Sequence, residues 1–138
     1  MKTISTITLS LIMVFALSNA MAQQDKKLVK AEKKFCTSIQ NLVSTIETLE
    51  VANEGSSMDE FRKAYKSAEK AYNKFEKSAE KLEKVEIKES QQAYNKLVDA
   101  VNNIDGDTKT AEATGQIDEH INSTAEEIDD ILTVVCQY

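Results

Sequence analysis

Proline is absent from the 138 residues of this chain, and only three glycines occur. Average proline usage of about 5% predicts about seven in a chain of this length. Because proline interrupts helices and glycine weakens them, a chain poor in both continues readily as helix over long stretches. The hydrophobic content of 41% is sufficient for a packed core, and the length favours one domain. The sequence therefore predicts a small all-α domain.

The first residues have the layout of an export signal. Lys2 supplies a positive charge, an uncharged stretch follows from Ile4 to Leu17, and Ala20-Met21-Ala22 allows cleavage before Gln23. An alternative cut lies before Met21, after Ser18-Asn19-Ala20. The uncharged stretch is shorter than the ~20 residues that cross a bilayer as a helix, so cleavage is favoured over an uncleaved anchor.

This layout divides the chain into two parts. We predict a signal peptide over residues 1–22 and a helical domain over residues 23–138, with no stable membrane anchor. The expected location of the mature protein is periplasmic or extracellular.

Cys36 and Cys136 are the only cysteines, one near each end of the predicted domain. An even number of cysteines in a small exported domain is typical of a disulfide. With a single histidine in the chain, a four-ligand zinc site would need carboxylates at unusual spacing. We predict an intramolecular Cys36–Cys136 disulfide; a free thiol or an intermolecular bond is the alternative.

Apolar residues in the first half of the domain recur at steps of four and three, the spacing of a heptad seam. The first predicted helix runs from about Lys26 to Val51 and ends at the turn Asn53-Glu54-Gly55-Ser56. Ser57, with Glu60 three positions later, is a capping-box pattern that begins the second helix. The apolar positions are Leu28, Phe35, Ile39, Leu42, Ile46 and Leu49, then Phe61, Tyr65, Ala68, Tyr72, Phe75, Ala79 and Leu82.

The sequence signals for helix boundaries are weaker in the second half of the domain. Val85 and Ile87 break the heptad phase, so we predict a tight connection at residues 85–89 and a third helix ending near Ile104. Asp105-Gly106-Asp107 is a stop signal. A fourth helix begins either at Thr108 or after Gly115. The inward positions of these two helices are Tyr94, Leu97, Val98 and Val101, then Ile117, Ile121, Thr124, Ile128, Ile131 and Val135.

The predicted disulfide selects the connectivity, because its two Cα atoms must lie within about 7 Å. If the second and third helices were continuous, a three-helix arrangement would place Cys36 and Cys136 at opposite ends of a rod ~40 Å long. An up-down-up-down four-helix bundle places them side by side. We therefore predict this bundle.

Charge is distributed unevenly along the chain. The net charge of −6 disfavours binding to nucleic acid, where affinity depends on Lys and Arg replacing counterions. The start of the first helix is nevertheless basic, and late in the fourth helix the chain is acidic. We interpret this as complementarity between two adjacent helix ends, with a membrane or polyanion patch as the alternative. The lysines are Lys26, Lys27, Lys30, Lys33 and Lys34, and the acidic residues are Glu126, Glu127, Asp129 and Asp130.

The candidate chemistry is sparse. His120 is the single histidine, so the paired Glu-x-x-His motifs of a carboxylate-bridged di-iron site are absent, and no metal site is predicted. No catalytic residue is predicted, because both cysteines are assigned to the disulfide and no serine lies in a strained-turn context. Met58 and His120 are weak candidates for axial haem ligands. The inward tyrosines Tyr65, Tyr72 and Tyr94 fit a core better than a ligand pocket.

These observations favour a non-enzymatic, exported helical protein that binds another protein and needs no cofactor. Chaperone-like, inhibitor-like and immunity-like roles all fit. The alternative is a carrier of haem or a small ligand in the bundle interior.

Overall fold

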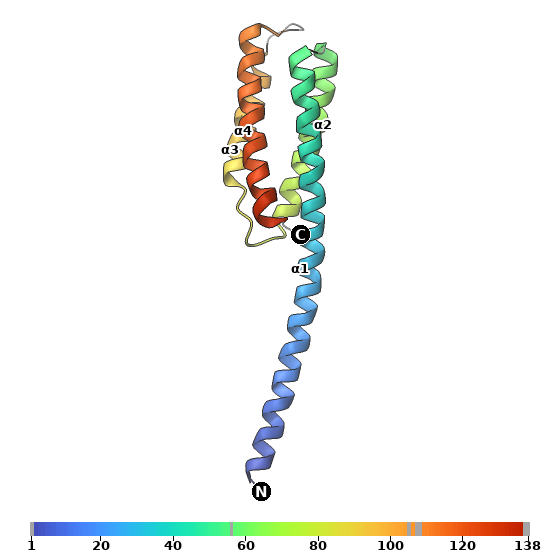
Figure 1. Ribbon diagram of the computed structural model, residues 1–138, viewed down its shortest axis with the longest axis vertical. Helices are drawn as coiled ribbons and strands as arrows, with labels where there is room; N and C mark the ends of the chain where they lie inside the picture. The colour runs from blue at the N-terminus through green and yellow to red at the C-terminus, as the bar shows by residue number, and fades with distance from the viewer. Residues whose placement is uncertain (1, 56, 105, 107–108, 137–138) are drawn as a thin grey trace.

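The computed structural model describes residues 26–55, 57–104, 106 and 109–136 in full, and residues 2–25 only as part of a helix. The helices are α1 (Lys2–Gly55), α2 (Met58–Ala79), α3 (Lys88–Asn102) and α4 (Ala111–Val135), and the described residues contain no strand (Figure 1). The predicted all-α class with four helices is confirmed. The predicted signal peptide, residues 1–22, lies outside the fully described part. Among the fully described residues, which begin at Lys26, no helix is long and apolar enough to span a bilayer.

The start of α2 follows the predicted capping pattern, but its end does not. The Ser57 Oγ accepts a hydrogen bond from the Glu60 backbone N–H at 3.3 Å. The helix ends at Ala79, so the predicted extension to Leu82 is wrong and the connection spans residues 80–87. The backbone tightens here, since the Leu82 N–H donates to the Ala79 carbonyl at 2.9 Å, three residues back. The Leu82 side chain is still buried in the core, and this explains why an apolar residue occurs at this position of the sequence pattern.

The second half also differs in its boundaries. α3 ends at Asn102, two residues before the predicted end, and Gly106 adopts a φ of +79° that favours glycine at the turn. Thr110 is the N-cap of α4, which begins at Ala111, and its hydroxyl oxygen accepts a hydrogen bond from the Ala113 N–H at 3.1 Å. The helix therefore starts between the two predicted points and passes through Gly115. The predicted start at Thr108 lies outside the described residues.

The core is the predicted heptad seam with few exceptions. The side chains of Phe35, Phe61, Phe75 and Ile128 are fully buried. Leu28 is the main exception: it is 47% exposed, so its predicted inward position is wrong.

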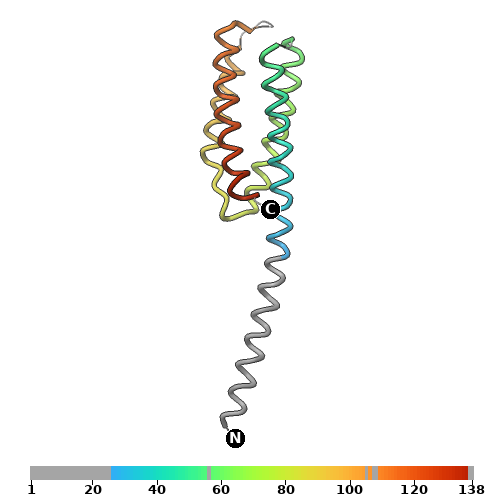
Figure 2. The backbone as a smooth tube through the Cα atoms, viewed as in Figure 1, coloured from blue at the N-terminus to red at the C-terminus, as the bar shows by residue number. Residues whose placement is uncertain are grey.

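Contacts between helices show which of them are neighbours. α1 packs against α2 and α4, and α3 packs against α4. Figure 2 shows the pair of α1 and α2 beside the pair of α3 and α4. No described Cα atom of α2 comes within 8 Å of one in α3. Side chains nevertheless connect these two helices, because the rings of Tyr72 and Tyr94 stack with their centroids 3.8 Å apart.

Candidate functional site

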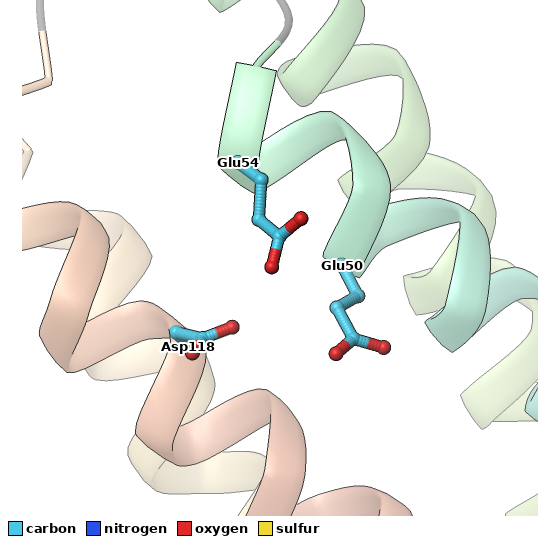
Figure 3. A group of neighbouring side chains, drawn as sticks. All are labelled: Glu50, Glu54 and Asp118. Atoms are coloured by element: carbon cyan, nitrogen blue, oxygen red, sulfur yellow. The ribbon is translucent and has the colours of Figure 1, made fainter.

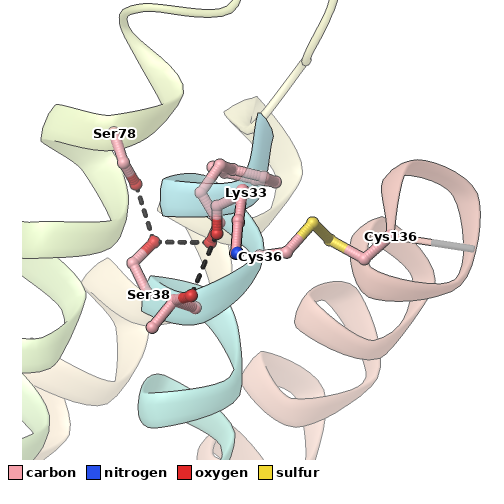
Figure 4. Close-up of a disulfide and its surroundings, with 7 residues drawn as sticks. Lys33, Cys36, Ser38, Ser78 and Cys136 are labelled. Carbon is pink, nitrogen blue, oxygen red and sulfur yellow. Dashed lines mark hydrogen bonds between the residues drawn. A yellow bond between two sulfur atoms is a disulfide. The ribbon is translucent and has the colours of Figure 1, made fainter. Parts of the chain in front are cut away.

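A disulfide ties the two ends of the domain together, as predicted. Cys36 in α1 and Cys136, which caps α4, form this bond with their Cα atoms 5.7 Å apart (Figure 4). On the α2 side, the hydroxyls of Ser38 and Ser78 are hydrogen bonded at 2.7 Å. One short segment of α1 is therefore held to both α2 and α4.

A groove of about 800 Å³ opens beside this disulfide. We call it the disulfide-end groove. Its walls are the first described turns of α1, the connection after α2, and the end of α4. The lining residues are Lys27, Leu28, Ala31 and Glu32 of α1, Lys81 to Val85 of the connection, and Val134 and Val135 of α4. A neighbouring cavity of about 440 Å³ shares Lys84, Val85, Val134 and Val135 with it.

Exposed apolar side chains gather at this end of the molecule. Of the large apolar residues that the structure describes, four are exposed, and Leu28, Val29 and Val134 belong to the helix segments that form the groove. Val134 is 79% exposed and lies two residues before Cys136. Single exposed apolar residues are ordinary on protein surfaces, but a group of them beside a concave surface is typical of an interaction site.

The weak haem candidates occupy different helices. Met58 is in the first turn of α2, half-buried against the core, and His120 is half-buried in α4. Among the described residues, His120 belongs to no cluster of three or more histidine, cysteine or carboxylate side chains. The pairing of Met58 with His120 stays a prediction.

Three carboxylates that the sequence analysis did not single out meet between α1 and α4. Oxygen atoms of Glu50, Glu54 and Asp118 all lie within 4.8 Å of one another (Figure 3). The Asp118 Oδ1 is buried and has no hydrogen-bond partner among the described residues. Carboxylate oxygens suit hard cations such as Ca²⁺, which takes 6–8 of them. Glu54 is exposed and Asp118 only half-buried, so we assign no metal here.

At the end of the molecule opposite the disulfide, a lysine joins the end of α1 to the start of α4. The Lys109 Nζ donates to the Asn53 backbone carbonyl at 2.8 Å and to the Asn53 Oδ1 at 2.9 Å. The buried Asn53 side chain donates in turn to the Thr114 carbonyl at 3.0 Å. The Lys109 ammonium also lies 4.1 Å from the centre of the Phe61 ring, and burial lowers its pKa. This network closes the end of the molecule opposite the disulfide.

The tyrosines are part of the core rather than a pocket lining. Tyr72 is 2% exposed and Tyr94 is 6% exposed, and neither hydroxyl has a hydrogen-bond partner in the described structure. Burial raises the pKa of Tyr72 to about 12, and the nearby Ser90 hydroxyl offsets only part of this rise. Burial likewise raises the pKa of Tyr94.

We expect Tyr72→Phe to keep the protein folded to a higher pH. The unfolded chain releases the phenol proton near pH 10, whereas folded Tyr72 holds it until about pH 12. Ionisation therefore has no effect on the stability of the wild type below about pH 10 and lowers it as the pH rises toward 12, by about 3 kcal/mol in total. Phenylalanine does not ionise, so the variant avoids this loss. Circular dichroism during alkaline titration should show a higher unfolding midpoint for Tyr72→Phe than for the wild type.

The control for this prediction is Tyr65→Phe, since the Tyr65 ring is only half-buried. We expect it to move the alkaline midpoint less. At pH 7 the Tyr72→Phe protein should be as stable as the wild type, because the removed hydroxyl makes no hydrogen bond. An alkaline midpoint that stays the same or falls would contradict the assigned pKa.

Comparisons with known proteins add no functional information. No protein family, curated protein sequence or solved structure matches this chain.

Proposed function

We propose that this chain is an exported, non-enzymatic protein that binds another protein through the disulfide-end groove. In this proposal residues 1–22 are removed as a signal peptide, and residues 23–138 act in the periplasm or outside the cell as an up-down-up-down four-helix bundle. A chaperone-like, inhibitor-like or immunity-like role fits such a protein.

The observation that carries the proposal is the exposure of apolar side chains at the groove. Leu28 of α1 and Val134 of α4 both line the groove and remain exposed, whereas most of the predicted apolar seam is buried. A groove of this size accepts the apolar face of a helix or an extended segment. Its burial by a partner would remove this apolar surface from water.

The disulfide supports the proposal in two ways. Disulfides persist in oxidising compartments, which agrees with export. The bond also fixes one wall of the groove, because Val134 and Val135 directly precede Cys136. The wall is therefore already in place before a partner arrives, which lowers the entropy cost of binding.

The test is capture of a partner by the oxidised protein, with a matched pair of surface variants. Val134→Asp places a charge in the groove, whereas Val51→Asp places one on α1 away from it; both valines are exposed, so both variants should fold. We expect Val134→Asp to weaken the complex by about tenfold or more and Val51→Asp to leave it unchanged.

The captured protein is identified by mass spectrometry, produced separately, and titrated against each variant by calorimetry. A complex with a defined stoichiometry that depends on Val134 supports the proposal. Equal binding by the Val134→Asp protein, or the lack of any defined complex, would rule out the groove as the binding surface.

A further inference from the structure

We infer that the Cys36–Cys136 disulfide is a redox switch for the disulfide-end groove. In the oxidised protein the groove is complete; in the reduced protein the end of α4 is released from it, while the rest of the bundle stays folded. This inference rests on the proposed function and adds its regulation. It follows from the unequal anchoring of the two cysteines.

Cys36 is held in place by its surroundings whether or not the bond exists. It lies within α1, directly after Phe35 and three residues before Ile39, and both of these side chains are fully buried. The Ser38 hydroxyl is also hydrogen bonded to the Ser78 hydroxyl of α2 (Figure 4). Loss of the bond therefore leaves this part of α1 packed against the bundle.

The end of α4 has no comparable anchor. Ile128 is the last fully buried residue that the structure describes in this helix, and Cys136 follows eight positions later. Between them only Ile131, Leu132 and Val135 are half-buried, and the other side chains are exposed. Helix ends with few buried apolar contacts open locally at a low cost in free energy. We therefore expect the disulfide to be what keeps this segment against α1.

This segment supplies one wall of the groove. Val134 and Val135 line the groove and directly precede Cys136. The other walls belong to α1 and to the connection after α2, where Leu82 is buried in the core. Release of the α4 end would remove one wall and leave the other two in place.

The bond lies where a thiol can reach it, because both of its cysteine residues are only half-buried. A thiolate of a dithiol reductant attacks one sulfur, the S–S bond breaks, and the other cysteine leaves with the electron pair and takes up a proton. The second thiolate of the reductant then displaces the first cysteine, which is protonated in turn. Two electrons pass to the protein, the reductant becomes a disulfide, and a disulfide oxidant reverses the exchange.

The experiment measures backbone order by NMR relaxation in the oxidised wild type, in the wild type reduced with dithiothreitol, and in a double variant. The double variant combines Cys36→Ser with Cys136→Ser and reproduces the reduced state without reductant. Ser38→Ala is the matched control, because it removes the hydrogen bond to Ser78 from the same segment of α1 and keeps the disulfide. Circular dichroism checks that each protein is folded.

We expect the amides from Leu132 to Cys136 to have order parameters of about 0.85 in the oxidised wild type and below about 0.6 without the bond. The amide of the buried residue Ile121 should stay near about 0.85 in every protein. Ser38→Ala should give the values of the oxidised wild type at both places.

The consequence for binding is tested with the protein that the oxidised wild type captures, once it has been identified and produced separately. By calorimetry, we expect the double variant to bind it about tenfold more weakly or worse, because the α4 wall must then be ordered on binding. Ser38→Ala should bind within about twofold of the oxidised wild type.

Three results would overturn the inference. If the order parameters after Ile128 are the same with and without the bond, packing alone holds the α4 end. If the reduced protein loses its helical circular dichroism signal, the bond maintains the whole domain rather than the groove. If the α4 end is released but the captured protein binds both forms equally, the groove is not under redox control.

Failure of the proposed function gives a different result. In that case reduction releases the α4 end, yet the oxidised wild type forms no complex that depends on Val134. Such a result would support the release of the α4 wall by reduction and refute binding through the groove.

Discussion

Cys36→Ser is expected to lower the free energy of unfolding by about 4 to 5 kcal/mol under oxidising conditions. The bond closes a loop of about 100 residues, so its loss releases a large chain entropy in the unfolded state. In the folded state the bond also holds the last turn of α4 against α1. Apolar packing contributes little there, because Val134 is exposed and Val135 is only half-buried. Urea unfolding followed by circular dichroism measures the change.

Two controls separate the disulfide from the cysteine side chain. The wild type in reductant should lose about as much stability as the oxidised Cys36→Ser protein does. Combining Cys36→Ser with Cys136→Ser should cause little further loss, since the bond is already absent. If the melting temperature of the wild type is the same with and without reductant, the bond does not stabilise the protein.

Ile128→Asp is expected to unfold the domain. Ile128 is fully buried in α4, and an aspartate there would be a charge without a partner in an apolar core. Either the charge stays buried or the carboxyl becomes protonated, and both cost several kcal/mol on top of the lost apolar contacts. That loss is comparable to the whole stability of a small domain, about 5 to 15 kcal/mol.

The measurement is the helical circular dichroism signal and its thermal transition at pH 7. Asn122→Asp is the matched control, because Asn122 is exposed on the same helix and the substitution adds the same charge. We expect the control to melt as the wild type does. A cooperatively folded Ile128→Asp protein would mean that this face of α4 does not lie in the core.

The interior of the molecule follows closely from the apolar pattern. Steps of four and three identified the buried residues of α1 from Phe35 to Leu49, because residues at this spacing share one face of a helix. The pattern was less informative at helix ends. Leu82 continues the apolar spacing although α2 ends at Ala79, since a side chain in a tight turn can still reach the core.

The surface sites were much harder to predict. Glu50 and Glu54 are one turn apart, but Asp118 joins them only because α4 packs against α1. Leu28 continues the apolar pattern of the sequence, yet it is 47% exposed and lines the groove. Single exposed valines such as Val134 carry no signal in the sequence that distinguishes them from buried ones.

Sequence alone determined the helical class, the positions of the core seam and the Ser57 cap, and it predicted the Cys36–Cys136 bond. These depend on local spacing, on proline and glycine content, and on the number and placement of cysteines. The tertiary structure decided where α2 ends, how far α2 and α3 stand apart, and which lysines and apolar side chains surround one groove. Those features depend on contacts between residues distant in the chain, and local periodicity carries no information about which distant surfaces meet.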